Sequence, residues 1–133
     1  ELGVAERIEF LGARPHADMP GLLCSADLAI FPSLMEATSV AALECMACGV
    51  PVAASAVGGL PQIVDDGVGG LFPPGDPEGL AAKVVELLSA GGLAERGVTG
   101  RRRVVARWSN ERLVDRHLAV YGKLADAGRS IVM

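Results

Sequence analysis

Two carboxylates, Glu36 and Glu44, stand in one short segment of the chain with seven residues between them. Glu36 follows an apolar stretch that Pro32 interrupts, and Glu44 falls inside a segment rich in alanine and leucine. A carboxylate is a strong acceptor of hydrogen bonds from hydroxyl groups. The pair could therefore bracket a ligand that carries several hydroxyls.

The elements that must position these carboxylates are predicted to be a strand, a loop and a helix. The apolar stretch 28–31 is typical of a buried strand. Thr38 or Ser39 then offers a hydroxyl N-cap to a helix that ends at Gly49, with Pro51 just beyond.

This order of elements predicts where a ligand would lie. In an open α/β sheet, ligands bind outside the carboxyl ends of the strands, and the free N–H groups at a helix start attract phosphate. We therefore expect residues 37–40 to face a diphosphate. Helical side chains lean toward the N-terminus, so Glu44 can reach back toward a ribose diol, while Glu36 accepts hydrogen bonds from sugar hydroxyls on the other side.

At these residues the sequence resembles the C-terminal, donor-binding domain of retaining GT-B glycosyltransferases, specifically family 4. The match covers about two thirds of the chain. Its most specific part is the glutamate pair together with the run Met46-Ala47-Cys48-Gly49-Val50-Pro51-Val52. The matching segments are 6–12, 25–28, 36–52, 58–61 and 67–77.

The alternation of strands and helices predicts an α/β fold with a Rossmann-like doubly wound parallel sheet. The resemblance implies the donor-binding half of a GT-B fold that lacks its first strands, over residues 1–127, with a tail at 128–133. The predicted strands are 8–11, 28–31, 52–54 and 70–72. The predicted helices are 18–25, 39–48, 61–65, 77–89, 93–107 and 110–127.

The family resemblance implies transfer of a sugar from a nucleotide-diphosphate sugar to an acceptor, with retention of the anomeric configuration. Glu36 is the expected catalytic residue, because it would position the sugar and support a cationic transition state. The expected donor-binding residues are Ser33, Ala37, Thr38, Ser39, Val40, Glu44 and His16. The expected partners are the nucleotide sugar, an acceptor glycan, lipid or small molecule, and a missing N-terminal acceptor domain.

Several of these residues also have a purely structural interpretation. Glu36 could only favour the helix N-terminus, Ser33 could only end a strand, and a loop histidine such as His16 is often structural. Gly58 and Gly59 fit a close approach of the backbone to the sugar donor, but turn formation alone would also explain them.

The sequence departs from the family pattern in two places. Gln62 stands where the family commonly has a glutamate, and the arginine and lysine that the family uses upstream of segment 8–11 have no counterpart here. No lysine or arginine lies between Pro15 and Ala82, although eight acidic residues do. Cations from elsewhere must therefore neutralise a diphosphate, since no cluster has metal-ligand spacing. We expect no cofactor and no strict metal requirement.

Length, composition and charge fit part of a larger enzyme. The 133 residues make at most one domain, and a net charge of −4 argues against nucleic-acid binding. Cys45 and Cys48 suggest small buried side chains in a reducing compartment, so a cytoplasmic setting is expected. The basic cluster at Arg101, Arg102, Arg103 and Arg107 is either a solvated helix face or a patch for anionic lipid headgroups at the inner face of a membrane.

Alternative functions remain at this point. The chain could be a nucleotide-binding or interaction module that has lost catalysis, or an epimerase with the GT-B fold. A dinucleotide-dependent oxidoreductase fits least, because no G-x-G-x-x-G follows a strand. We expect the isolated chain to transfer no sugar and to self-associate through unpaired strand edges.

Overall fold

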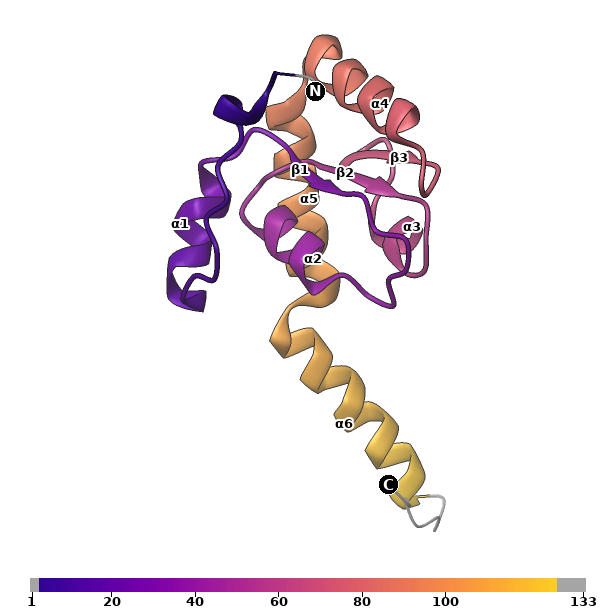
Figure 1. Cartoon of the computed structure of the whole chain (residues 1–133). Helices are drawn as coiled ribbons and strands as arrows, with labels where there is room; N and C mark the ends of the chain where they lie inside the picture. Colours follow the sequence, from indigo (N-terminus) through magenta and orange to yellow (C-terminus); the bar gives the residue numbers. More distant parts are fainter. Residues whose placement is uncertain (1–2, 127–133) are drawn as a thin grey trace.

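The computed structural model describes residues 3–126 and shows a small parallel sheet between helices (Figure 1). Within that range, eleven elements follow one another along the chain. In order they are η1 (Ala5–Arg7), η2 (His16–Asp18), α1 (Met19–Cys24), β1 (Ala29–Phe31), α2 (Val40–Ala47), β2 (Val52–Ser55), α3 (Leu60–Ile63), β3 (Gly69–Phe72), α4 (Pro77–Ala90), α5 (Leu93–Trp108) and α6 (Asn110–Asp126).

The sheet has the strand order β1-β2-β3, and both pairings are parallel. β2 is the central strand, and Val52 pairs with Ala29 on one side and Gly69 on the other. Its four residues are all buried, as expected for a strand covered on both faces. The predicted parallel α/β fold is confirmed.

Helices cover both faces of the sheet because successive side chains of β2 point in opposite directions. Val52 and Ala54 belong to a core that also contains Met46 of α2 and Val104 of α5. Ala53 belongs to a second core with Leu87 of α4. These two apolar layers fix the carboxyl ends of the strands relative to α2.

α5 can pack closely on the C-terminal end of α2 because a glycine lies at their crossing. A Cβ built on Gly97 would lie 1.9 Å from the carbonyl oxygen of Gly49, which no side chain could tolerate. Further along α5, Gly100 faces the Met46 side chain. The backbone of α5 therefore rests directly against the end of α2.

The predicted strand at 8–11 is wrong for this structure. Residues 8–11 form no strand, and Ile8 and Phe10 are 54% and 93% exposed. A strand needs a neighbour for its N–H and C=O groups. Within residues 3–126 the sheet contains β1, β2 and β3 alone, and none of them pairs with this segment.

The other predicted elements are found with small shifts at their ends. The predicted helix at 18–25 is observed as η2 followed by α1, and the one at 61–65 as α3, which begins one residue earlier and ends two residues earlier. α6 follows α5 and extends away from the sheet (Figure 1). Ala127 and the predicted tail at 128–133 lie outside the described residues.

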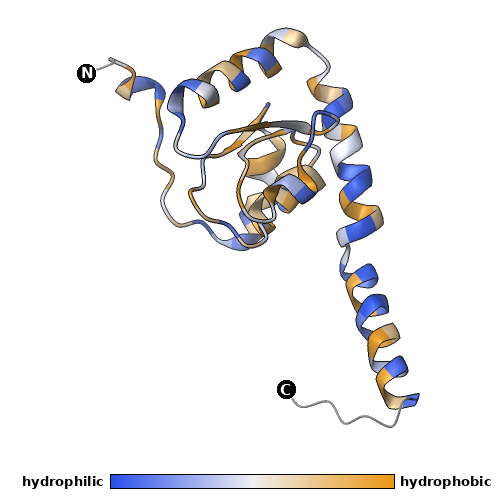
Figure 2. Cartoon of the chain, turned by 90° about the vertical axis from the view of Figure 1, so that its right-hand side faces the viewer, coloured by the Kyte–Doolittle hydropathy of each residue, from blue (hydrophilic) through white to orange (hydrophobic). Residues whose placement is uncertain are grey.

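Apolar and polar residues alternate along α6, as the colours of Figure 2 show. Leu113, Leu118 and Tyr121 are among its exposed apolar residues. No helix in the described range is long and apolar enough to cross a membrane.

Candidate functional site

The loop between β1 and α2 carries most of the predicted site residues at the carboxyl end of β1. The chain leaves the strand at Phe31 and enters α2 at Val40. Ser39 is the N-cap, and its buried Oγ accepts a hydrogen bond from the Ala42 N–H at 3.3 Å. The sequence did not decide whether Thr38 or Ser39 is the N-cap residue, and the structure assigns this position to Ser39.

The first turn of α2 is the part of this loop that could hold an anion. Helix geometry leaves the N–H groups of Val40 and Ala41 without acceptors inside the helix. Ala37, Thr38 and Val40 are exposed, so solvent reaches this turn. These N–H groups together with the helix dipole favour phosphate at this position.

Two glycines before α3 lie directly against the backbone of the β1–α2 loop. Gly58 has φ +52°, and a Cβ there would lie 1.5 Å from the Glu36 carbonyl oxygen. A Cβ on Gly59 would lie 2.3 Å from the Ala37 carbonyl oxygen. The close approach that the sequence suggested for these glycines is therefore made with the protein's own backbone, directly beneath Glu36.

A buried serine, which was not predicted from the sequence, also holds the β1–α2 loop in place. Ser55 ends β2 and is fully buried. Its Oγ donates to the Ser33 carbonyl oxygen at 2.5 Å and lies 3.3 Å from the Phe31 carbonyl oxygen. The one available signal was a hydroxyl at the end of an otherwise apolar strand. Ser55 ties the start of the site loop to the central strand.

The predicted donor-binding residues His16 and Glu44 are brought together, although 28 positions separate them. His16 Nε2 lies 3.1 Å from Glu44 Oε1. The His16 side chain is 84% exposed and that of Glu44 is 36% exposed. His16 begins η2, which continues directly into α1, and α1 packs on α2. The packing of α1 on α2 therefore explains how His16 reaches Glu44 in the middle of α2.

A cavity of about 610 Å³ opens beside Glu44, between α2, α5 and α6. Its wall is mainly apolar and includes Val40 and Trp108. Arg107 and Arg116 also line it, so two cationic side chains of the C-terminal helices share this cavity with Glu44. Neither arginine is near Glu44 in the sequence, so its place beside this cavity depends on the packing of α5 and α6.

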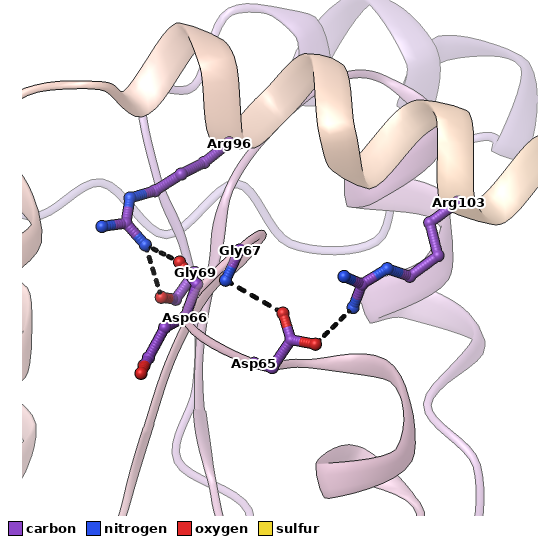
Figure 3. Close-up of polar contacts among 6 residues, drawn as sticks. All are labelled: Asp65, Asp66, Gly67, Gly69, Arg96 and Arg103. Atoms are coloured by element: carbon purple, nitrogen blue, oxygen red, sulfur yellow. Dashed lines mark hydrogen bonds and ion pairs between the residues drawn. The ribbon is translucent and has the colours of Figure 1, made fainter.

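Two arginines of α5 bind the turn that leads into β3 (Figure 3). The Arg103 guanidinium lies 2.8 Å from Asp65 Oδ2, and this hydrogen bond lowers the pKa of Asp65. Arg96 donates to the carbonyl oxygens of Asp66 and Gly69.

Arg101, in the same basic cluster, donates to the Ala47 carbonyl oxygen at the end of α2. Arg101 and Arg103 therefore each bind another element of the domain, although Arg101 is exposed, as Arg102 and Arg107 are. The alternative of a lipid-binding patch thus depends on fewer free guanidinium groups than the sequence suggested.

Comparison with known proteins places this fold and loop in one family. Residues 1–90 match the family described as "Glycosyl transferases group 1". The chain belongs to this family. The match includes the whole β1–α2 loop and α2, and therefore both carboxylates.

Individual members of the family agree with this assignment. The chain is 40% identical over 127 residues to D-inositol 3-phosphate glycosyltransferase of Salinispora arenicola, which is 95% of this chain and 28% of that protein. It thus spans little more than a quarter of this curated relative's length.

Solved structures match almost the whole described chain. Sucrose-phosphate synthase from Thermosynechococcus elongatus superposes with a TM-score of 0.87 at 33% identity, over 93% of this chain and 32% of that one. Anabaena HepE in complex with UDP-glucose gives a TM-score of 0.77 at 28% identity, over 94% of this chain and 34% of that one. The fold is that of the C-terminal half of GT-B glycosyltransferases.

Proposed function

We propose that this chain is the donor-binding part of an enzyme that transfers a sugar from a nucleotide-diphosphate sugar with retention of the anomeric configuration. The observation that carries the proposal is the β1–α2 segment. It places Glu36 just before the N-terminus of α2 and Glu44 one turn inside the helix, at the carboxyl edge of a parallel sheet.

The diphosphate would bind at the first turn of α2. The N–H groups of Val40 and Ala41 have no acceptor inside the helix, and the turn is open to solvent. One helix terminus contributes about 0.3–1 kcal/mol at an exposed site. Cations from outside residues 15–82 are therefore needed as well, and the missing upstream basic pair is the expected source.

Glu44 would accept hydrogen bonds from the ribose hydroxyls. Its side chain is partly exposed, and one carboxylate oxygen contacts His16, which leaves the other free for a ligand. His16 is a donor-binding candidate through this contact, and Ser33 and Thr38 are further candidates from the same loop.

Glu36 would act at the sugar. As the anomeric carbon gains positive charge in the transition state, a fixed carboxylate beside it becomes more stabilising than it is in the ground state. Gly58 and Gly59 support this role because they allow the backbone of Glu36 and Ala37 to lie directly against the start of α3. A loop fixed in this way needs little reorganisation during the reaction.

A uridine nucleotide is the first donor to test. HepE, whose fold matches at a TM-score of 0.77, has been solved with UDP-glucose, and its sequence is 28% identical. Nothing in the described residues chooses between bases, so GDP and ADP sugars belong in the same screen.

The test is a thermal-shift and calorimetric screen of the complete gene product against UDP, GDP and ADP and their sugars. We expect one nucleotide series to bind, and Glu44→Gln to weaken that binding about three- to tenfold, the worth of one or two hydrogen bonds. Binding without any turnover would support a module that has lost catalysis. Absence of binding in all three series would contradict the proposal.

A further inference from the structure

The three cysteines of the chain occupy different environments. Cys24 ends α1 and is exposed, Cys48 caps the C-terminus of α2 and is partly buried, and Cys45 is buried within α2. Because α1 packs against α2, Cys24 and Cys48 meet at the ends of two neighbouring helices. Cys45 is buried, as expected from the sequence, whereas Cys48 is only partly buried.

The Cys24 side chain contacts the backbone of Cys48. The Cys24 thiol donates to the Cys48 carbonyl oxygen at 3.9 Å, and burial together with the neighbouring Cys24 thiol raises the pKa of Cys48. A disulfide forms without backbone movement only where two cysteines already lie side by side. We propose that Cys24 and Cys48 are a modification site at which a disulfide joins α1 to α2.

Cys45, three residues before Cys48, is the less accessible partner, because its side chain is buried whereas that of Cys48 is only partly buried. Burial raises the pKa of the Cys45 thiol to about 11, so the reactive thiolate is scarce at neutral pH. Burial is also the largest influence that raises the pKa of Cys48, while Cys24 is the exposed thiol of the three. A reagent in solution therefore meets Cys24 first.

The oxidant is a low-molecular-weight disulfide, and the reaction proceeds by two thiol exchanges. The Cys24 thiolate attacks one sulfur of the reagent, which gives a mixed disulfide and releases one small thiol. The Cys48 thiolate then attacks the Cys24 sulfur and releases the second small thiol. The protein loses two electrons and two protons, and the reagent is reduced to two thiols.

The cross-link would close a loop that contains the candidate site. Glu36 and Glu44 both lie between Cys24 and Cys48 in the chain, and η2 with His16 comes directly before α1. A bond between the helix ends would restrict the movement of η2 and α1 relative to α2. The inference does not depend on which ligand the site takes.

The experiment treats the folded complete gene product with oxidised glutathione and maps the peptides without reduction. We expect a cross-linked peptide pair that contains Cys24 and Cys48 and disappears on reduction. The same treatment in denaturant should give mixed pairings that include Cys45, since the selectivity comes from the fold.

Three variants complete the test. Cys45→Ala keeps both partners and should still form the cross-link, whereas Cys24→Ser should not. Cys48→Ser should stop at a stable glutathione adduct on Cys24. If the wild-type protein also stops at that adduct with Cys48 still reduced, or joins two chains instead, the proposal is wrong.

Discussion

His16 Nε2 lies 3.1 Å from Glu44 Oε1, so the turn before α1 contacts the middle of α2 at the residue proposed to bind ribose. In the proposed site His16 acts on the ligand through Glu44, by holding the carboxylate in one orientation with its second oxygen free.

Replacing His16 by alanine should weaken sugar-donor binding without slowing the chemical step. The lost hydrogen bond is worth about 0.5–1.5 kcal/mol, which corresponds to a roughly two- to tenfold rise in KM with kcat nearly unchanged. His16→Asn, which keeps an N–H group, should recover part of the loss. The matched control is His117→Ala on α6, where the ring lies 2.8 Å from the Leu113 carbonyl oxygen and packs edge-on against Tyr121 of the same helix. Equal effects of both alanine variants would contradict the role of His16.

The two carboxylates should respond differently to the same substitution. Glu44→Gln should mainly raise KM for the sugar donor, because a ribose contact is present in both ground and transition states. Glu36→Gln should mainly lower kcat, by about 10²-fold or more, because its interaction strengthens as charge develops. Steady-state kinetics of both variants decide this point. Small and equal changes in KM and kcat for the two variants would indicate that both residues are only structural.

Gly58→Ala should damage the site loop. The new Cβ would meet the Glu36 carbonyl oxygen, and the positive φ adds strain. We expect a loss of roughly 2–4 kcal/mol in the free energy of unfolding, measured by urea denaturation. Gly12→Ala is the matched control, since φ there is +66° but no atom lies within 4 Å. It should cost only about 1 kcal/mol, and an equal cost for both would exclude the clash.

The ion pair between Asp65 and Arg103 should make a small, pH-dependent contribution to stability. The hydrogen bond from Arg103 lowers the pKa of Asp65 below its ordinary 3.8 in the folded state. A carboxyl with a lowered pKa stabilises the fold above its unfolded pKa, and this stabilisation is lost as the pH falls through the folded value.

Asp65→Asn tests this contribution. Because the Asp65 side chain is 58% exposed, solvent screens the pair and the loss should stay below about 1 kcal/mol at pH 7. Urea denaturation of wild type and variant should differ at pH 7 and converge as the pH falls below 3.8. A difference that persists unchanged at lower pH would show that the charge of Asp65 is not responsible.

Local sequence signals predicted the parts of the fold that depend on neighbours in the chain. Ser39 before an alanine-rich helix and Pro32 after an apolar stretch were enough to predict β1, the loop and α2. Segment 8–11 was misassigned because its apolar pattern says nothing about a pairing partner, and within residues 3–126 it has none in the sheet.

Contacts between distant parts of the chain could not be predicted in the same way. The pairing of His16 with Glu44 depends on how α1 packs against α2, and the support of Ser33 by Ser55 depends on the register of β1 and β2. Arg107 and Arg116 reach the cavity beside Glu44 because of where α5 and α6 lie. Each residue type was visible in the sequence, but its partner was set by tertiary packing.

The β1–α2 segment is proposed to serve a retaining transfer from a nucleotide sugar. The most direct measurement uses the complete gene product with UDP-glucose, an acceptor panel and EDTA, and follows the anomeric proton of the product by NMR. We expect transfer that persists in EDTA, gives a product with the anomeric configuration of the donor and is lost in Glu36→Gln. A product of inverted configuration, or transfer that Glu36→Gln leaves intact, would contradict it.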